Sequence, residues 1–524
     1  MPGGGLISLI AYGTQNVILS GNPDMTYFFK TFKKYTHFSL ETISKAFDGP
    51  TTSYPYDRTV QVTTQVDRRG DLLSDVYISF TLPPIFSKHL ASSGENIYPD
   101  PGQGTRLEQE FQWVKAVGAL AIDTVYVTIG PNKIQEFTGE YLMAKAMLDL
   151  PKDAYEKWQR MVGDVPELTD PATGIYGNPT VIPPQYPTVF RDNTASTQTN
   201  NPSIPGYKVY VPIPFWFTEE GQALPLVGLQ VYPVSITVIF RPARELYSTL
   251  DSNGFRMAPG YSVNPMSIKT NPNRPAYNNI SDSDVQIRQF LTDFNTNPPE
   301  LNTWSFNPTL YTTYVFLPES EQKIFATTPL SYVIREVTHV SFNNIVSHSL
   351  LDLYVHNPIT RIVLLPRRSD SIYYRNKHDN FTNWWDWPTR PKQLTLSDSG
   401  PIPYSSGVSV AGAQVDIIAS LRILSDGNEI QEVNDGQFFT DLTQFKYLSG
   451  GANRRIPVYT FELHSPTPQA AGSINASRIN KFQLDVDIFP LGPLPTYIYT
   501  IDVYVENINF FLIESGMGSK KYAT

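Results

Sequence analysis

Runs of alternating apolar and polar residues recur along the whole chain. When apolar and polar residues alternate with a period of two, successive side chains point to opposite faces of a β-strand. One face then lies on a core and the other in water. The runs are Thr59–Val66, Asp75–Leu82, Thr124–Ile129, Val231–Phe240, Tyr311–Leu317, Val337–Phe342, Arg361–Leu365, Val415–Ile423, Val458–Leu463, Phe482–Phe489 and Tyr497–Val505. Because these runs do not alternate with long helices, we predict antiparallel sandwiches and no doubly wound α/β fold.

Two segments predict helices. Gly139–Leu150 consists mainly of helix-forming residues and contains no proline until Pro151, so we predict a helix that ends there. Pro318–Phe325 predicts a short helical turn near the middle of the chain.

Three long segments rich in Pro, Asn and Thr interrupt the strands. They are Asp164–Gly206, Arg241–Thr303 and Ser369–Ser406. Loops of this length in a compact protein are usually functional or disordered. Because both halves of the chain carry such loops, we predict one sandwich scaffold used twice, each copy with elaborated loops.

The composition agrees with a β-rich protein that has many loops. A length of 524 residues suffices for about two to four domains. Hydrophobic residues make up 41% and are enough for sizeable cores, whereas charged residues make up only 17%, against a usual ~25%.

Charge and cysteine content exclude several classes of function. The formal net charge is −9, so no direct specific nucleic-acid binding is expected. The chain has no cysteine, which excludes a disulfide scaffold, a zinc–thiolate site and a cysteine nucleophile. No apolar run reaches the ~18 residues of a membrane span. Met1–Gly5 lacks the basic region that is typical of a secretory signal.

No motif for catalysis, metal binding or cofactor binding is found. None of the seven histidines has the spacing of a metal site, and the chain has no Gly-x-Ser-x-Gly elbow and no P-loop. Asp485 and Asp487 share one face of a predicted strand, but a solvated face explains them more simply than a glycosidase pair. We therefore predict no enzyme, with no catalytic, metal-binding or cofactor-binding residue and no cofactor.

Two further clusters have a simple structural interpretation. Trp384, Trp385 and Trp387 could form a sugar-stacking platform, but large apolar rings that anchor a loop are the favoured interpretation. The basic pairs Arg367-Arg368 and Arg454-Arg455 predict contacts with carboxylates or with a partner subunit.

Three Asn-x-Ser/Thr sequons begin at Asn279, Asn380 and Asn475. They are candidate glycosylation sites if the chain meets glycosyltransferases.

Several motifs, in a fixed order, carry a resemblance to a known family. At the N-terminus they are Leu9–Pro23 (Leu-Ile-Ala-Tyr-Gly-Thr-Gln-Asn-Val-Ile-Leu-Ser-Gly-Asn-Pro), Thr26–Lys30 and Lys34–Glu41. Further along they are Arg69–Asp75, Phe111–Val114, Ile129–Ile134, Pro212–Phe217, Ala223–Gln230, Arg478–Asn480, Val505–Ile513 and Ser515–Gly518. Together they resemble the major capsid proteins of the nucleocytoplasmic large DNA viruses. The departures at Thr14, Asn16 and Ser20 are mild, and Pro131-Asn132 replaces the usual Gly-Gly or Gly-Gln.

The resemblance implies an all-β fold of two eight-stranded jelly rolls in tandem, a double jelly roll with long loops and a few short helices. In this sequence it implies an N-terminal arm at 1–25, a first jelly roll at 26–318 with long loops at 164–206 and 241–303, a linker at 319–330, and a second jelly roll at 331–524 with a long loop at 369–406.

The resemblance also implies a function. It predicts a viral major capsid protein that forms a homotrimeric, pseudo-hexameric capsomer and tiles the icosahedral shell of a large double-stranded DNA virus. The expected partners are the chain itself, neighbouring capsomers, minor capsid and penton proteins, a nearby inner viral membrane, and the host surface through outer loops. The expected location is the outer shell of the virion, with assembly in the host cell cytoplasm.

The arm and the loops have expected roles in such a shell. The arm lies on the inner side and contacts neighbours or minor proteins through a short apolar run of Leu6, Ile7, Leu9, Ile10 and Tyr12. The long loops face outward, where function and variation gather on a rigid scaffold. The alternatives are a carbohydrate-binding or adhesin-type β-sandwich surface protein, which rests on the tryptophans, and a jelly-roll glycoside hydrolase. Neither accounts for ordered motifs at both ends of the chain.

Overall fold

The computed structural model describes residues 3–24, 26, 28, 30, 34–87, 110–177, 186–187, 201–250, 256–259, 285–292, 298–373, 375–384, 415–451, 455–465, 470–491 and 497–522. The chain divides into two units, Met1–Ser39 and Leu40–Thr524. The second unit is called the body below.

The N-terminal unit contains two short helices, α1 (Gly4–Ile10) and α2 (Thr14–Ser20). The turn between them is held locally, because the Asn16 side chain accepts a hydrogen bond from the Gly13 amide at 3.2 Å. Every residue from 4 to 24 is exposed. The sequence did not predict these helices, since helices this short have little intrinsic stability.

The body begins with a sandwich of two antiparallel sheets, called the first sandwich. One sheet has the order β1-β12-β3-β7, with β8 paired to β3, and the other has the order β2-β9-β5-β6. The strands are β1 (Ser39–Ala46), β2 (Val60–Gln65), β3 (Leu72–Leu82), β5 (Ile122–Ile129), β6 (Asn132–Thr138), β7 (Tyr207–Pro212), β8 (Leu224–Pro225), β9 (Val234–Phe240) and β12 (Thr309–Phe316). Residues such as Ile78, Phe80 and Val127 alternate into a fully buried core.

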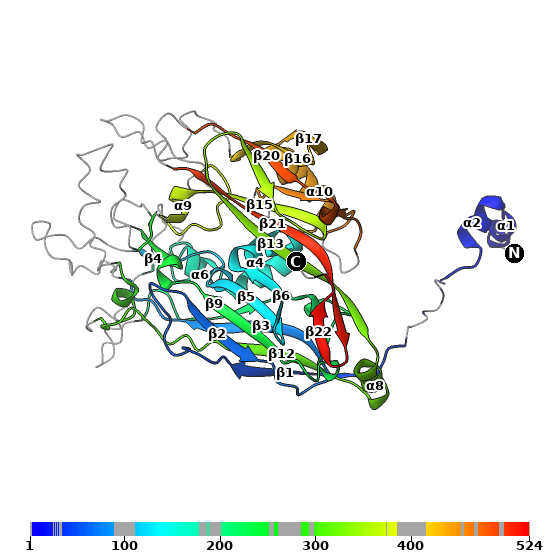
Figure 1. Ribbon diagram of the computed structural model, residues 1–524, viewed down its shortest axis with the longest axis horizontal. Helices are drawn as coiled ribbons and strands as arrows, with labels where there is room; N and C mark the ends of the chain where they lie inside the picture. The colour runs from blue at the N-terminus through cyan, green and yellow to red at the C-terminus, as the bar shows by residue number, and fades with distance from the viewer. Residues whose placement is uncertain are drawn as a thin grey trace, which may run out of the picture. The chain divides into compact units, whose positions relative to one another are not determined.

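A second sandwich follows along the chain (Figure 1). Its sheets have the orders β13-β21-β15-β18, with β19 paired to β15 and β22 to β21, and β14-β20-β16-β17. The strands are β13 (Leu330–Ile345), β14 (Ser349–Leu353), β15 (Pro358–Arg368), β16 (Ile418–Ser425), β17 (Asn428–Asp435), β18 (Val458–Thr460), β19 (Ile474–Asn475), β20 (Phe482–Ile488), β21 (Tyr499–Glu514) and β22 (Met517–Lys520).

Both sandwiches have one topology. If the main strands of each are numbered from 1 to 8 along the chain, the two sheets read 1-8-3-6 and 2-7-4-5 in both cases. This is the strand order of a jelly roll. The predicted double use of one scaffold is therefore confirmed.

The helices lie mainly at the ends of the strands. The predicted helix at Gly139–Leu150 is α4 (Gly139–Asp149), whose first turn is capped by Thr138, because Thr138 Oγ1 accepts from the Tyr141 amide at 3.2 Å. The predicted turn at Pro318–Phe325 is α8 (Glu319–Thr327), between β12 and β13. The other α-helices of the described residues are α3 (Val117–Leu120), α5 (Lys152–Val162), α6 (Pro166–Thr169), α9 (Ser369–Tyr373) and α10 (Thr443–Tyr447).

Parts of the segments predicted as loops are regular structure. In Arg241–Thr303, β10 (Tyr247–Leu250) joins β11 (Arg256–Met257) and β4 (Glu110–Trp113) in a small sheet. The short helical turns are η1 (Trp216–Thr218), η2 (Leu226–Gly228), η3 (Ala243–Glu245), η6 (Ile287–Phe290), η7 (Phe438–Leu442) and η8 (Ala476–Arg478). The predicted domain boundaries stay predictions, although α8 occupies most of the predicted linker.

The prediction of one wet face per strand is wrong for β15 and β21. All residues of β15 except Pro358 are buried. Ile362 and Leu364 belong to the core of the second sandwich, whereas Val363 and Leu365, on the opposite face, belong to the core cluster of the first. One sheet thus serves two cores, because its outer face packs on the neighbouring sandwich.

Candidate functional site

The surface where the two sandwiches meet is the most elaborate polar site among the described residues, and it is called the junction. The outer faces of β15 and β21 contribute Arg361, Arg367, Asp502 and Glu506, and their register places Arg361 opposite Glu506. The first sandwich contributes mainly α4 (Figure 1). Charged side chains buried at such a contact need partners, from their own sandwich or from the opposite one.

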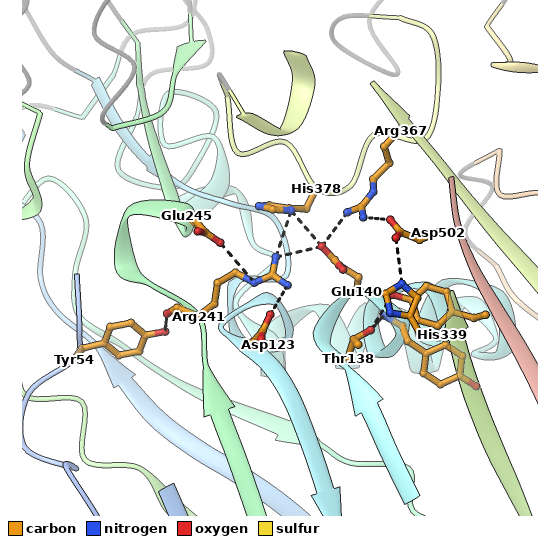
Figure 2. Close-up of polar contacts among 12 residues, drawn as sticks. Tyr54, Asp123, Thr138, Glu140, Arg241, Glu245, His339, Arg367, His378 and Asp502 are labelled. Carbon is orange, nitrogen blue, oxygen red and sulfur yellow. Dashed lines mark hydrogen bonds and ion pairs between the residues drawn. The ribbon is translucent and has the colours of Figure 1, made fainter. Parts of the chain in front are cut away.

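The first cluster of the junction is centred on Glu140 of α4 (Figure 2). Glu140 Oε1 accepts hydrogen bonds from Arg367 Nη1 at 2.9 Å and from Arg241 Nη1 at 3.2 Å, and His378 Nδ1 lies 3.6 Å away. Arg367 also pairs with Asp502, which contacts His339 Nε2 at 3.1 Å. Glu140 therefore joins the end of β9 to strand β15 of the second sandwich.

The charges of this cluster determine its protonation. Burial raises the pKa of Glu140, but Arg367, Arg241 and His378 outweigh this and hold the pKa well below its usual range. Burial lowers the pKa of His378, and the two neighbouring arginines lower it further, against the opposing effect of Glu140. Glu140 is thus ionised and His378 neutral near pH 7.

The second cluster is centred on Arg361, whose side chain is fully buried. Its guanidinium pairs with Asp149 at the end of α4, and its Nε donates to Glu506 Oε1 at 2.9 Å. Tyr141 OH donates to the same Glu506 oxygen at 2.8 Å. Burial raises the pKa of Asp149, but Arg361 and Lys145 outweigh it and lower the pKa to about 2. The buried guanidinium of Arg361 thus connects Asp149 of the first sandwich to Glu506 of the second and holds the two sandwiches in one relative position.

Hydrogen bonds to backbone carbonyls join the two sandwiches on either side of the junction. Ser449 Oγ donates to the Asp149 carbonyl at 2.7 Å, and the Gly451 amide donates to the Leu150 carbonyl at 3.0 Å. Asn376 Nδ2 donates to the carbonyls of Arg244 and Tyr247 at 2.6 and 2.8 Å. The segments predicted as loops around Arg241 and Ser369 therefore touch each other and help to join the two sandwiches.

Most residues of the junction could not be identified from the sequence. The basic pair Arg367-Arg368 was predicted to contact carboxylates, and it does, because Arg368 pairs with Asp370 as Arg367 does with Glu140 and Asp502. Arg455 likewise pairs with Asp416 and Asp441, whereas Arg454 lies outside the described residues. A weak signal for Arg361 and Glu506 exists in retrospect, since each charge is flanked on both sides by uncharged residues of an apolar strand.

The other predicted residues are scattered. Leu6, Ile7, Leu9 and Ile10 of α1, and Tyr12, are exposed by 57 to 79% within the N-terminal unit. Asp487 is exposed, as a solvated face predicts, whereas Asp485 on the same face is covered by Arg422 and His348, with which it pairs. Trp384 is half-buried, and Trp385 and Trp387 lie outside the described residues.

The three sequons differ in accessibility. Asn475 is exposed, and Asn279 lies outside the described residues. Asn380 is only 1% exposed, and its Nδ2 donates to the Trp384 carbonyl at 2.6 Å. In the folded chain this nitrogen, which would carry a glycan, is therefore not accessible.

The described residues contain no group of three or more His, Cys, Asp or Glu side chains arranged to hold a metal ion. Within the same residues, no helix has the length and apolar character to span a membrane.

The paired sandwiches and their junction define a double jelly-roll protein. A sequence profile described as "Major capsid protein N-terminus" matches residues 26–317, which is more than half of the chain. The chain belongs to the major capsid protein family of large DNA viruses. The resemblance seen in the sequence is thereby confirmed.

Individual relatives match over nearly the full length. The major capsid protein of Chrysochromulina ericina virus is 25% identical over 601 residues, covering 99% of this chain and all of that protein. The major capsid protein of Phaeocystis pouchetii virus is 25% identical over 563 residues, covering 99% of each. The solved Faustovirus major capsid protein, at 14% identity, has the same fold with a TM-score of 0.62 over 97% of this chain and 96% of that one. These relatives are structural capsid proteins, and major capsid proteins are components of the virion.

The ionised Glu140 and neutral His378 predict a two-stage dependence of stability on pH. The unfolded chain protonates His378 near its ordinary pKa of 6.5, but the folded chain resists this, so acidification below about pH 6.5 favours unfolding. The depressed pKa of Glu140 stabilises the fold above about pH 4.5, and this contribution is lost as the pH falls towards the folded pKa. The urea midpoint should therefore decline gently below pH 6.5 and steeply below pH 4.5.

The variant His378→Gln isolates the first stage. It should flatten the urea midpoint between about pH 6.5 and 5 and leave the steeper decline at lower pH. An unchanged slope between these two pH values would show that His378 does not cause the first stage. His356→Gln serves as the control, since His356 is exposed and should leave both stages in place.

Proposed function

We propose that three copies of this chain form a trimeric capsomer with a pseudo-hexagonal outline, and that such trimers tile the faces of an icosahedral shell. The observation that carries the proposal is the repeated strand order, 1-8-3-6 and 2-7-4-5, in two sandwiches joined within one chain. Three such chains present six similar sandwiches around a three-fold axis. Closed rings of identical chains need heterologous contacts that return on themselves.

The junction supports this role because a capsomer in a lattice needs its two sandwiches in a fixed relative orientation. Buried ion pairs between Arg361, Asp149 and Glu506 hold the two sandwiches in one register. A tile whose halves could rotate against each other would not fit a lattice repeatedly. We propose that the chain is divided into an arm at 1–25, a first jelly roll at 26–318, a linker at 319–330 and a second jelly roll at 331–524. The junction then holds the two jelly rolls together as one tile.

The N-terminal arm carries a segment suited to contacts with other proteins. Its apolar residues Leu6, Ile7, Leu9, Ile10 and Tyr12 are exposed on and beside α1, and exposed apolar clusters commonly mark interaction sites. We propose that the arm lies on the inner side of the shell and contacts neighbouring capsomers, minor capsid or penton proteins, near an inner viral membrane. Apart from the segments packed at the junction around Arg241 and Asn376, the loops at 164–206, 241–303 and 369–406 face outward to the host surface, and Asn279 and Asn475 are the candidate glycan sites. Assembly takes place in the host cell cytoplasm.

The test compares the full chain with a variant that lacks residues 1–24. Light scattering on a size-exclusion column should give both proteins a mass near three times that of the chain, because no residue of α1 or α2 is buried. For the full chain this is three times 59.0 kDa. Electron microscopy of particles assembled in infected or transfected cells should show shells only for the full chain.

A second variant separates the apolar side chains from the mere length of the arm. Replacing Leu6, Ile7, Leu9 and Ile10 by serine should impair shells as the deletion does, whereas Gln15→Ala in α2 should not. A clean monomer for the full chain would overturn the trimer, and normal shells from the deletion variant would overturn the role of the arm.

A further inference from the structure

A cavity of about 280 Å³ lies in the first sandwich, next to the junction. Helices α4 and α5 form one side of it, and strands β3 and β7 with the turn after β7 form the other. Its apolar lining consists of Val76, Leu142, Ala146, Leu150, Trp158 and Ile213. Neither the capsid fold nor the proposed assembly assigns a role to this space.

The size and lining of the cavity indicate what it can hold. A dry protein cavity of about 150 Å³ binds benzene, and ligand pockets begin at about 300 Å³. A volume of about 280 Å³ therefore suits a bicyclic aromatic ring or an alkyl group of similar size. Val76, Leu142, Ala146, Trp158 and Ile213 are each at most 6% exposed, so the apolar part of the lining is largely screened from bulk water.

The charged residues along the cavity are unequally compensated. Lys145 pairs with Asp149 at 2.8 Å, and Asp149 also pairs with Arg361 across the junction. Asp75 of β3 is half-buried, and among the described residues it has no Lys, Arg or His within 4.0 Å. Burial raises the pKa of Asp75, with only the Ser74 hydroxyl acting against it, as expected for a carboxylate that lacks a cation.

We propose that this cavity binds a small hydrophobic amine, with its aromatic body among the apolar residues and its protonated nitrogen at Asp75. A free small molecule is preferred over a side chain of a partner protein, because little of the apolar lining is exposed to solvent. A neutral ligand would leave Asp75 without a cation. An anionic ligand would meet two carboxylates, Asp75 and Asp149, and one lysine, Lys145, which is already paired with Asp149. The amine is therefore the class that matches both the apolar and the charged part of the lining.

Occupation of this cavity has a consequence for the junction. Asp149 lines the cavity and at the same time holds Arg361 of the second sandwich. A ligand that binds only the folded chain raises its unfolding midpoint by mass action. The bound amine should thus stabilise the two sandwiches together.

The experiment uses the full chain and three probes with one ring system. Calorimetric titration with 2-(1-naphthyl)ethylamine is compared with the neutral 2-(1-naphthyl)ethanol and the anionic 1-naphthylacetate. The amine should bind about tenfold more tightly than the alcohol, and the anion most weakly, as expected for one charge-assisted contact. Saturating amine should also raise the thermal midpoint.

Two variants assign the binding to the cavity. Ala146→Leu fills the space and should weaken both the amine and the alcohol at least about tenfold. Asp75→Asn should remove the preference for the amine and leave the alcohol unchanged, and its half-exposed position keeps the test decisive if Ala146→Leu fails to fold. Asp487→Asn, an exposed carboxylate on β20, is the matched control and should change nothing.

Several results would overturn the proposal. These are no heat of binding with the amine, equal affinities for amine and alcohol in the unmodified chain, or unchanged binding after Asp75→Asn. Binding to the free chain that disappears in the assembled oligomer would instead assign the cavity to a contact between subunits, and would overturn it too.

Discussion

Replacing Arg361 by methionine should lower the free energy of unfolding by about 3–5 kcal/mol, the loss that follows when one partner of a buried ion pair is removed. The side chain of Arg361 is fully buried and pairs with both Asp149 and Glu506. Asp149 has Lys145 as its only other ion-pair partner among the described residues. Methionine keeps much of the volume but leaves two carboxylates together in a dry site. Urea unfolding near pH 7, followed by tryptophan fluorescence, measures the loss.

Two controls show whether the loss comes from charge. Arg422→Met removes an arginine that also pairs with two carboxylates, Asp485 and Glu429, but lies at the surface, so it should change the midpoint far less. Adding Asp149→Asn and Glu506→Gln to Arg361→Met should recover part of the loss, because the uncompensated charges are gone. If the triple variant were as unstable as the single variant, lost packing and not charge would be the cause.

Replacing Gly450 by alanine should destabilise the body by about 3 kcal/mol, at the upper end of the usual cost of overpacking. A Cβ atom at Gly450 would lie 2.2 Å from the Leu148 carbonyl oxygen and 2.4 Å from its carbon. Because both are backbone atoms at the end of α4, no side-chain movement relieves the overlap. The segment must move away, and the contacts of Ser449 and Gly451 with α4 and its end are then lost.

Thermal unfolding checks this prediction, with Gly5→Ala as the control. Gly5 lies in α1, where a Cβ atom would meet nothing within 4 Å, so alanine there should leave the midpoint of the body unchanged. A Gly450→Ala variant as stable as the control would mean that the segment tolerates a shift and does not fix the sandwiches.

The strands could be predicted from the sequence because their signal is local. Strand β2 (Val60–Gln65) alternates between buried positions and exposed or half-buried ones. The predicted run Thr59–Val66 is longer than this strand by one residue at each end. Helix α4 was predicted for a similar reason, since its residues favour a helix and a threonine caps its start. Helix α5 was missed, although Tyr155, Trp158 and Val162 recur at helical spacing and are buried.

The junction could not be predicted, because it depends on contacts between distant parts of the chain. Arg361 and Asp149 are 212 residues apart, and nothing near either residue indicates the other. The same distance effect explains why β15 and β21 are buried on both faces. A local pattern shows that a strand has two faces, but not that a second sandwich covers the outer one.

The double burial of β21 also bears on when the chain can finish folding during synthesis. Domains usually fold from the N-terminus as they leave the ribosome, at about 5–20 residues per second. Tyr504, Phe511 and Ile513 of β21 belong to the core cluster of the first sandwich, however, and β21 is near the end of the chain. We therefore expect the first sandwich to keep part of its apolar surface uncovered during synthesis until β21 has emerged. A nascent chain that stops before β21 would lack this cover on its first sandwich.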